Sequence, residues 1–555
     1  MTAWRERASW LLHAGVRAYL QTEARRFVRA ADRLEEAQRR RLAAVLDATR
    51  DSEQGRSLQL HRIRSARELQ DAVPLSGPEG VRRQVEAVLR GDHRQLTGTP
   101  PTRIELTGGS SGPSKHVPMT RALLSEFHRA LAPWLVDLLR ARPALRRGPW
   151  YWSISPLGAR AGRTAGGLPV GSGSDASYFP AVLRPALELL LAVPGEVARL
   201  SDVATCRYVT ARLLLERADV TLISVWNPSF LTLLLEAALA EAPSLVRDLR
   251  DGTCRPPGLD GPAAQVLGRF RFARSAAQAA RLQELISRPS RPTAAELFPR
   301  LSLVSCWTDS SAERALPPLL AALGSGVEVQ GKGLLATEGV VTLPLFEAPA
   351  PVLAVRSHFY EFIDPERPSA RPRLAHELES GRSYEVVMST SGGLLRYRLG
   401  DLVRVAGWWR RAPCLSFVGR ADAVVDLVGE KLSVAWASRA LADALREVAG
   451  RAPVDFAMLG PEWCAPPAYH LFVDAPLEDE ALRALGQALE ARLASGSAYG
   501  YARRLGQLGP IKAVRVRAGR ARYEARCMAL GQRAGDVKPV DLHREPGWLD
   551  HFTAA

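Results

Sequence analysis

Residues 1 to about 70 alternate apolar and charged positions, with apolar clusters such as residues 42–46 set among arginines and glutamates. The apolar positions recur at a period of about 3.6 residues, which predicts amphipathic helices. Pro74 and the pair Gly77-Pro78 then interrupt the pattern, because proline cannot continue a helix. We therefore expect the chain to open with a layer of helices.

Short strand-like runs follow, separated by helical patterns. The run at residues 103–106 precedes a loop rich in glycine and serine and then a helix-periodic segment at residues 121–139, so the order strand, loop, helix is predicted. Further strand-like runs lie at residues 220–225, 301–306, 351–356, 384–389 and 402–405. Strands that alternate with helices indicate the α/β class.

A second arrangement begins after Gly419-Arg420. Helix-periodic segments alternate with strand-like runs, at residues 434–448, 469–473, 478–493 and 511–516. The length of 555 residues also exceeds the size at which a single core keeps growing. We predict a large N-terminal domain of residues 1–420, with β-sheets flanked by helices, and a small α+β C-terminal domain of residues 421–555.

The composition is that of a globular protein, with 46% hydrophobic and 24% charged residues. The formal net charge of +16 raises the alternative of a basic nucleic-acid-binding protein. However, the arginines are scattered among acidic residues, and the densest basic string, residues 38–41, lies on a helical pattern. We expect solvated helix faces and no nucleic-acid partner.

The cysteines and the apolar segments bear on the compartment. Six cysteines fall at long, irregular spacings without a C-x-x-C pair, which argues against a zinc site or a disulfide framework and fits a reducing cytoplasm. The N-terminal stretch is cut by charged residues and lacks the apolar core of a signal peptide. The most apolar window, residues 222–242, is interrupted by Asn227, Pro228 and Glu236, so we expect buried core and no membrane span.

Lysine is so rare in this chain that each one is a candidate functional residue. Only five of the 74 basic residues are lysines: Lys115, Lys332, Lys431, Lys512 and Lys538. A lysine is a compact, mobile charge suited to contact a phosphate or carboxylate oxygen. A base-composition bias toward arginine is the alternative, so the neighbouring residues must decide. For Lys512 a place on the surface of a strand is the better interpretation.

The first candidate string is Thr107-Gly108-Gly109-Ser110-Ser111-Gly112-Pro113-Ser114-Lys115. Its small residues and hydroxyls allow backbone N–H groups to surround an anion, with a lysine at the far end. It does not match the P-loop pattern, because Lys115 comes three residues after Gly112 and precedes His116. A plain surface turn is the alternative.

Three further strings carry candidate chemistry. Thr337-Glu338 places a hydroxyl beside a carboxylate, which could take phosphate and Mg²⁺, or be a solvated turn. In Arg398-Leu399-Gly400-Asp401 the aspartate ends a strand-like segment and could accept both hydroxyls of a ribose, or lie in a hairpin turn. Gly419-Arg420-Ala421-Asp422 lies at the predicted domain boundary, before Gly429-Glu430-Lys431.

The order of these strings is more specific than any one of them. A phosphate loop, Thr-Glu, Arg-x-Gly-Asp, Gly-Arg-x-Asp at a hinge and a near-terminal lysine together resemble the adenylate-forming superfamily. Within it, the chain resembles a bacterial-type member of the Gretchen Hagen family of auxin-responsive acyl acid amido synthetases. The matching segments are residues 73–75, 96–98, 115–118, 336–339, 359–362, 384–387, 393–401 and 536–539. One departure is the loop, where the family reads Ser-Gly-Thr-Ser-Gly but Gly108 replaces the first serine and Ser110 the threonine.

The resemblance implies an ATP-dependent ligase that forms C–N bonds. A small carboxylic acid would first react with ATP, in the presence of Mg²⁺, to give acyl-AMP and pyrophosphate. An amine, typically from an amino acid, would then attack the mixed anhydride and release AMP, leaving an amide. Both steps depend mainly on positioning and on stabilisation of charge.

The resemblance also implies roles for individual residues. The ATP-binding residues would be Ser110, Ser111, Gly112, Lys115, Ala336, Thr337, Asp401, Arg420 and Lys431. Ser110 to Gly112 and Lys115 would surround the β- and γ-phosphates, with Lys115 also catalytic, while Thr337 would lie near the α-phosphate and Asp401 would hold the ribose. Arg420 would contact ribose or phosphate at the hinge. Glu338 would bind Mg²⁺, and Lys538, on the mobile C-terminal domain, would reach the α-phosphate or the carboxylate during adenylation.

The acyl pocket is expected to draw on residues 121–139 and 225–228, whose apolar character suggests an aromatic or aliphatic acid. Ordinary core packing explains the same pattern equally well. Two alternatives to the amido synthetase remain beside the basic binding protein. One is an acyl-CoA or carrier-protein ligase, which shares the adenylation step. The other is a scaffold that keeps the fold without turnover.

Overall fold

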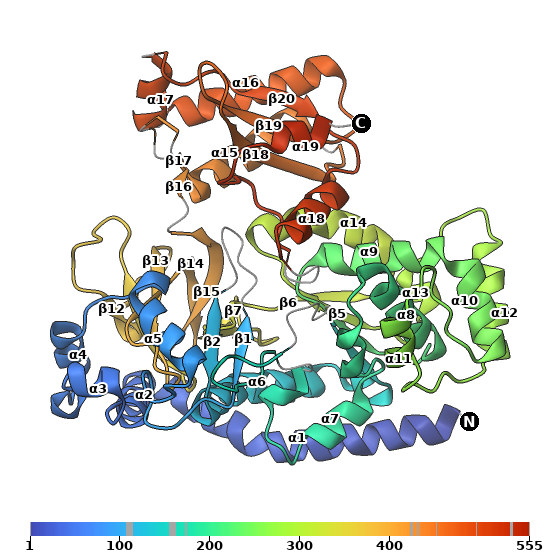
Figure 1. Cartoon of the computed structure of the whole chain (residues 1–555), viewed down its shortest axis with the longest axis horizontal. Helices are drawn as coiled ribbons and strands as arrows, with labels where there is room; N and C mark the ends of the chain where they lie inside the picture. The colour runs from blue at the N-terminus through green and yellow to red at the C-terminus, as the bar shows by residue number, and fades with distance from the viewer. Residues whose placement is uncertain are drawn as a thin grey trace.

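The structure, a computed structural model, divides into a broad lower body and a smaller upper body formed by the C-terminal residues (Figure 1). The described residues are 2–106, 115–154, 162–171, 175–421, 424–425, 427–428, 430, 432–450, 452–495, 497–504, 506–532 and 537–553. The large body carries a four-stranded parallel sheet and a seven-stranded sheet, and the small body carries a three-stranded one. This mixed α/β architecture is the one predicted.

The predicted opening layer of helices is confirmed. It consists of α1 (Thr2–Asp32), α2 (Leu34–Thr49), α3 (Glu53–Ser57), α4 (Ala66–Ala72) and α5 (Pro78–Arg90). Ser52 and Ser65 begin α3 and α4, because each hydroxyl accepts a hydrogen bond from a backbone N–H three residues on. The long α1 runs along the bottom of the large body and packs against α6 (Arg121–Ala141) (Figure 1).

The predicted order strand, loop, helix around the glycine-rich segment is wrong in one respect. After β1 (Arg103–Leu106), a second strand, β2 (His116–Met119), pairs with it antiparallel before α6 begins. Pro118 concealed this strand, because proline disfavours a strand interior and is tolerated only where no ladder hydrogen bond is lost. Residues 107–114, between the two strands, lie outside the described residues.

The parallel sheet has the order β3 (Trp150–Trp152), β4 (Leu222–Ser224), β5 (Leu303–Cys306), β6 (Glu328–Gly331). The helices of this half are α7 (Arg184–Leu190), α8 (Val203–Glu216), α9 (Pro228–Ala240), α10 (Ala242–Asp251), α11 (Gly261–Leu267), α12 (Ala276–Ile286), α13 (Ala294–Leu297) and α14 (Leu316–Leu323). Parallel strands require such crossovers, so their carboxyl ends all meet at one edge of the sheet. That edge borders the site described below.

The seven-stranded antiparallel sheet has the order β12-β11-β13-β14-β15-β10-β9. Its strands are β9 (Thr342–Leu343), β10 (Val352–Leu353), β11 (Phe359–Ile363), β12 (Arg373–Leu374), β13 (Ser383–Ser389), β14 (Tyr397–Trp409) and β15 (Ala412–Arg420). The prediction that Asp401 ends a strand is wrong, because β14 continues through it. Gly400 has φ of 77° beside an irregular register, so the turn-like glycine marks a bulge and no strand end.

The small body contains two sheets and five helices among its described residues. Its strands are β16 (Val424–Val425), β17 (Leu432–Ser433), β18 (Phe456–Glu462), β19 (Ala468–Asp474) and β20 (Lys512–Arg515), and its helices are α15 (Val434–Val448), α16 (Asp479–Ala494), α17 (Ser497–Arg504), α18 (Gly519–Ala529) and α19 (Trp548–Thr553). The predicted α15, α16, β19 and β20 are confirmed, whereas β18 and α18 were missed. The boundary between residues 420 and 421 stays a prediction.

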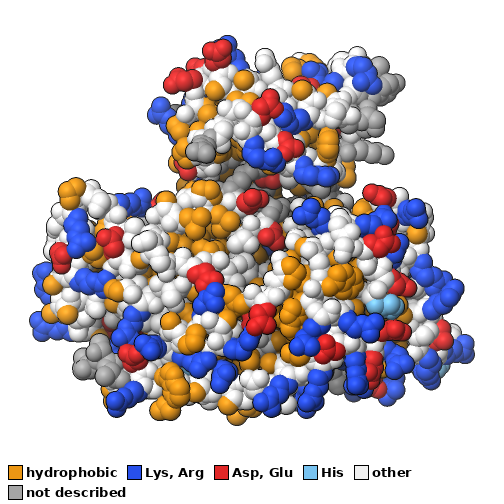
Figure 2. Space-filling model, turned by 180° about the vertical axis from the view of Figure 1, so that it is seen from behind, with side chains coloured by type: hydrophobic (Ala, Val, Ile, Leu, Met, Phe, Trp, Pro, Cys, Tyr) orange, Lys and Arg blue, Asp and Glu red, His pale blue; other side chains and the backbone are white. Residues whose placement is uncertain are grey.

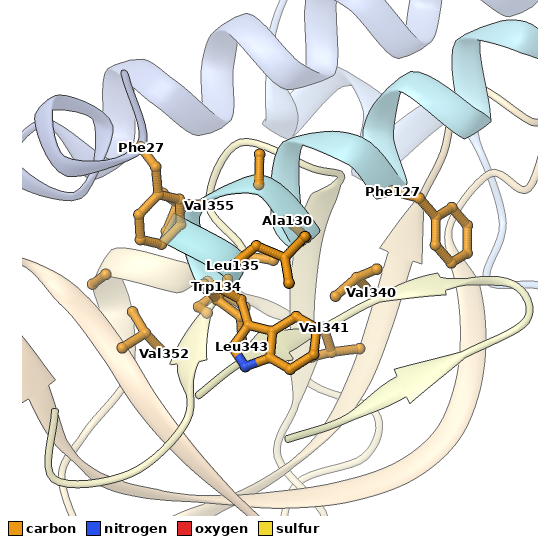
Figure 3. Close-up of a cluster of buried hydrophobic side chains, with 14 of the residues drawn as sticks. Phe27, Phe127, Ala130, Trp134, Leu135, Val340, Val341, Leu343, Val352 and Val355 are labelled. Atoms are coloured by element: carbon orange, nitrogen blue, oxygen red, sulfur yellow. The ribbon is translucent and has the colours of Figure 1, made fainter. Parts of the chain in front are cut away.

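The core nearest to the site lies where α6 crosses the second half of the large body. Figure 3 shows Phe127 and Trp134 of α6 on either side of Val340, with Leu343 beside Trp134 and Phe27 of α1 at one side. These side chains are buried, and burial of each large apolar side chain contributes about 1.5–3 kcal/mol. The packing fixes α6 directly behind β8 (Gly339–Val340).

Two further predictions concern the basic residues, expected to lie among acidic ones, and the apolar window at residues 222–242, expected to be buried core. Figure 2 shows arginine and lysine side chains interspersed with acidic ones over the visible face. Within the described ranges, no individual helix has both the length and the apolar character to cross a bilayer, and the bent pair of α9 and α10, with 74° between them, meets those criteria together. The inward face of α9 is buried.

Candidate active site

A cavity of about 1420 Å³ lies where the large body meets the small one. Its walls come from α6, from the edge of the parallel sheet, from the seven-stranded sheet and from the segment after residue 537. Of the predicted site residues, these line it: Lys115, Ala336, Thr337, Glu338, Asp401, Arg420 and Lys538. The remaining ones, Ser110, Ser111, Gly112 and Lys431, lie outside the described residues. Segments far apart in sequence thus converge on one volume.

Thr337 and Glu338 form the turn of a short hairpin between β7 (Leu335–Ala336) and β8. Glu338 is buried, so its carboxylate is directed by the protein and not by bulk water. The residue after it must be glycine, because a Cβ on Gly339 would lie 2.6 Å from Nε2 of His358. The turn is therefore held tightly against the core.

Asp401 and Arg420 face each other across β14 and β15. Nη1 of Arg420 donates to Oδ1 of Asp401 at 3.1 Å, and Asp401 is buried while Arg420 is half-buried. A buried carboxylate beside a guanidinium stays available as a hydrogen-bond acceptor for hydroxyl groups. This pair lies at the end of the large body, next to the small one.

Lys538 enters the cavity from the small body. Its Nζ lies 4.1 Å from the centre of the Trp307 ring, which belongs to the segment after β5. An ammonium over an indole face is attracted by the ring quadrupole. Behind Lys538, the backbone is anchored by Tyr523, whose hydroxyl donates to the Lys538 carbonyl at 3.1 Å, and by the buried Val537.

The wall formed by the parallel sheet combines aromatic side chains with a row of polar side chains that runs across the strands. Register pairs Trp152 with Ser224, Ser224 with Ser305, and Ser305 with Gln330, so these side chains share one face of the sheet. Among the described residues, Trp152 Nε1 and Ser305 Oγ are buried without a hydrogen-bond partner. Residues of both predicted pocket segments line the cavity, namely Phe127, Ala130, Leu131, Trp134, Trp226 and Asn227. Their role in binding the acyl group stays a prediction.

Lys332 lies at this aromatic wall, which the sequence did not reveal. Its Nζ donates to Ser224 Oγ at 2.6 Å and lies 4.8 Å from the centre of the Trp226 ring. The nearby Cys306 is buried, which raises the pKa of its thiol to about 12 although Lys332 acts in the opposite direction. Cys306 therefore stays protonated at neutral pH and is a poor nucleophile.

A second contact between the bodies joins α8 to α18. Nη2 of Arg207 on α8 donates to Oε1 of Glu524 on α18 at 2.8 Å. Burial raises the pKa of the Glu524 carboxyl, and the charge of Arg207 partly offsets this. The bodies are thus joined by a largely buried ion pair as well as by Lys538.

Several residues in the matching segments are structural. Glu361 of β11 accepts from Arg396 at 3.0 Å, and both side chains are almost fully buried. Arg396 also donates to the Val73 carbonyl at 2.6 Å, which ties a distant segment to the start of β14. Glu385 similarly accepts from Arg398 at 2.6 Å. These pairs hold the sheet that carries Asp401 and line no reaction centre.

The residues present fit a magnesium nucleotide. Within the described parts of the chain, no group of three or more His, Cys, Asp or Glu side chains gathers as a protein-made metal cage. Mg²⁺ in nucleotide sites commonly uses one or two carboxylates together with phosphate oxygens and water. Glu338, buried at the tip of the hairpin beside the Thr337 hydroxyl, matches that donor set.

Two family profiles match the chain. The GH3 family N-terminal domain matches residues 23–325, and the GH3 family central domain matches residues 351–420. Among curated relatives, the probable indole-3-acetic acid-amido synthetase GH3.6 of Oryza sativa subsp. japonica is 33% identical over 138 residues, 23% of this chain and 28% of the relative. The indole-3-acetic acid-amido synthetase GH3.15 of Arabidopsis thaliana is 23% identical over 385 residues, 65% of this chain and 63% of the relative. The aligned regions span less than two thirds of these relatives.

The fold is similar to a solved structure over nearly its whole length. The structure described as AtGH3.15 acyl acid amido synthetase in complex with 2,4-DB superposes with a TM-score of 0.83 and 18% sequence identity, covering 96% of each chain. The match extends over both bodies, so this chain has the same fold as that protein, with a large domain and a smaller C-terminal domain. With more than half of its residues matched by the first profile, this chain belongs to the GH3 family.

Proposed function

We propose that the chain is an acyl acid amido synthetase that uses ATP to activate a small carboxylic acid and transfers the acyl group to an amine, typically of an amino acid. The observation that carries the proposal is the convergence of Lys115, the Thr337-Glu338 turn, Asp401 and Lys538 on one cavity. Membership of the GH3 family, whose named relatives include amido synthetases, supports it.

Activation is needed because a carboxylate is anionic and has a poor leaving group. Attack of the acid carboxylate on the α-phosphorus of ATP forms the acyl-AMP anhydride and expels pyrophosphate. Lys538, at the mouth of the cavity, would balance the charge of the carboxylate and the α-phosphate. Fixed charges in a site shielded from water stabilise such a transition state.

The remaining residues would bind and orient ATP. Ser110, Ser111 and Gly112 with Lys115 would surround the β- and γ-phosphates, and Lys431 is a further phosphate candidate. Ala336 and Thr337 would border the α-phosphate, Asp401 would accept from the ribose hydroxyls, and Arg420 would contact ribose or phosphate. Glu338 would hold Mg²⁺, which when bound neutralises phosphate charge.

In the second step the nitrogen of the neutral amine attacks the acyl carbon and the C–N bond forms. The C–O bond to the phosphate of AMP breaks, AMP leaves with its electron pair, and the nitrogen loses a proton to the solvent. We propose residues 421–555 as a mobile domain that rotates between the two steps, with Arg420 at the hinge. The aromatic wall favours an aromatic or aliphatic acid. The cytoplasmic location stays a prediction from the spacing of the cysteines.

The test is pyrophosphate release from Mg-ATP across a panel of aromatic and aliphatic acids, with and without mixed amino acids, followed by mass spectrometry of the products. We expect release that depends on the acid, and an amide that forms only when amino acids are present. If coenzyme A in place of amino acids gave a thioester and no amide formed, the acceptor would be a thiol. If no acid released pyrophosphate, the proposal would be wrong.

A further inference from the structure

A buried hydrogen-bonded chain lies behind the cavity wall. Glu126 of α6 and His358 are both fully buried, and Nδ1 of His358 lies 2.9 Å from Oε2 of Glu126. Nε2 of His358 accepts from the backbone N–H of Val340 at 3.1 Å. Because Nε2 is the acceptor, the proton of the neutral ring is on Nδ1, and this N–H donates a hydrogen bond to the Glu126 carboxylate.

The Glu126 carboxylate has two further donors, both from Ser391. The backbone N–H of Ser391 donates at 3.0 Å and its hydroxyl at 2.7 Å. A carboxylate removed from water is stable only when its oxygens are satisfied in this way. Donors from two segments, neither close to Glu126 in sequence, therefore converge on this one side chain.

The segments that this hydrogen-bonded chain joins, those of Glu126, Val340 and Ser391, each adjoin proposed ATP contacts. α6 follows directly on β2, which begins next to Lys115, and its N-cap Thr120 also donates to the Ser391 carbonyl at 3.2 Å. Val340 is in β8, directly after the Thr337-Glu338 turn. Ser391 precedes β14, the strand of Asp401.

The position of the His358 ring is fixed on every side. Gln38 donates to the His358 carbonyl at 3.1 Å, and the ring packs edge-on against Phe127 and Tyr360 with centroids 6.3 and 5.9 Å away. The Gly339 Cα leaves no room for a Cβ on the other side. The ring therefore acts as a spacer of set length between Glu126 and the hairpin.

We propose that Glu126 and His358 are positioning residues that hold the Lys115 segment, the Thr337-Glu338 turn and the Asp401 strand in register for Mg-ATP. The inference rests on the proposed function for the identity of the ligand. Neither residue lines the cavity, so they act through Val340 and Ser391. A displacement of about 1 Å in such a site can cost on the order of 100-fold in rate.

The test uses variants that remove either the hydrogen bond of His358 to Val340 or its hydrogen bond to Glu126. In His358→Gln the amide lies near the former Nε2 and can still accept from the Val340 N–H, whereas in His358→Asn it lies near the former Nδ1 and can donate only to Glu126. Glu126→Gln keeps the shape but sets an NH₂ group against a donor. The matched control is Asp248→Asn, a buried carboxylate that accepts from Tyr208, Thr253 and the Arg255 N–H on the far side of the large body.

For each variant the melting temperature, the Kd for Mg-ATP by calorimetry and the KM values for ATP and acid are measured on the full chain. We expect the Kd and KM for ATP to rise by about ten-fold or more in Glu126→Gln and His358→Asn, less in His358→Gln, with the KM for acid within about two-fold. Asp248→Asn should lower the melting temperature without changing ATP binding.

The proposal would be overturned if the affinity for ATP stayed at the wild-type value in Glu126→Gln and His358→Asn. It would also be overturned if the KM for ATP and the KM for acid both rose in proportion to the fall in melting temperature, as a purely structural defect would produce. Should Glu126→Gln fail to fold, the two His358 variants still decide. ATP binding is measured without acid or amine, so a wild-type chain that binds Mg-ATP but forms no amide would refute the proposed function alone. A wild-type chain that does not bind Mg-ATP would overturn both.

Discussion

The two walls of the cavity are built on different physical principles. The wall of the antiparallel sheet and the β7–β8 hairpin presents charged and hydroxyl groups held by buried ion pairs and hydrogen bonds, as at Asp401 with Arg420 and Glu126 with His358. The wall of the parallel sheet, as far as its residues are described, presents indole rings together with the cation of Lys332. The first wall suits a ligand of fixed charge and hydrogen-bonding pattern. The second selects by shape and apolar contact.

Because the two walls differ in this way, substitutions in each wall should change different kinetic constants. Changes in the charged wall should alter the KM for ATP and leave the KM for acid, whereas changes in the aromatic wall should do the reverse. Lys538 belongs to neither wall, because the small body carries it. Its removal should therefore reduce the rate of acyl-AMP formation with less effect on either KM.

The largest effect is expected for Lys538→Ala. Loss of one charge-stabilising group at a reaction centre lowers the rate by about 100- to 1000-fold, and we expect a fall of that size in acid-dependent pyrophosphate release. The matched control is Lys512→Ala, an exposed lysine at the start of β20 on the same body, which should keep the wild-type rate. Acyl-AMP formation at the wild-type rate in Lys538→Ala would remove Lys538 from the mechanism.

The second prediction tests the charged wall. In Asp401→Asn one carboxylate oxygen becomes an NH₂ group that cannot accept from a ribose hydroxyl, so the KM for Mg-ATP should rise by about 10- to 100-fold, since a hydrogen bond to a charged group contributes about 1.5–3 kcal/mol. The KM for acid should stay within about two-fold. Asp364→Asn is the control, because Asp364, directly after β11 of the same sheet, is also buried and also pairs with an arginine, Arg382 at 3.0 Å. Equal ATP effects in both variants would indicate a general loss of sheet stability.

The third prediction tests the aromatic wall. Lys332→Met keeps an unbranched stem between the tryptophans but removes the ammonium. We expect the KM for acid to rise by about ten-fold, equivalent to about 1.4 kcal/mol, and the KM for ATP to stay unchanged. A rise in the KM for ATP instead would move Lys332 to the nucleotide side of the cavity. Trp152→Phe, which replaces the indole with a smaller phenyl ring and removes the unpartnered N–H, sharpens the comparison and should have the smaller effect on the acid.

The charged wall was largely predictable from sequence, and the aromatic wall was not. Lys115, Glu338 and Asp401 stand in short strings where glycine and polar residues interrupt apolar runs, and such interruptions are rare enough to be noticed; Lys538, outside this wall, stands in a similar string. The tryptophan and serine row of the parallel sheet lies inside buried strands, where a pocket residue and a core residue obey the same pattern. Only the register of the strands brings that row together.

Glu126 and His358 escaped notice for a different reason. They are 232 residues apart, and Glu126 lies in a helix whose charged positions are expected to face water. A single sequence carries no signal that this carboxylate is buried. Conversely, Glu361 and Arg396 belong to segments that resemble the family and are a buried structural pair. The resemblance selected several residues that line one cavity, but it did not distinguish residues that hold the sheet from residues that line the cavity.

The smallest effect is expected at the contact between the two bodies. Arg207→Ala leaves the Glu524 carboxyl buried without its guanidinium, so docking of the small body weakens and acyl-AMP formation should fall by about two- to five-fold at pH 8, within the range measured for single ion pairs.

Burial raises the pKa of Glu524, and loss of Arg207, which lowers it, raises that pKa further. The ionised carboxyl therefore opposes docking in the variant, and the deficit relative to wild type should shrink as the pH is lowered and the carboxyl takes up a proton. Arg207→Ala combined with Glu524→Gln, which has no charge to bury, should remove the pH dependence of the deficit. A deficit that stayed constant with pH in the single variant would mean that the Arg207–Glu524 pair does not set the docking of the small body.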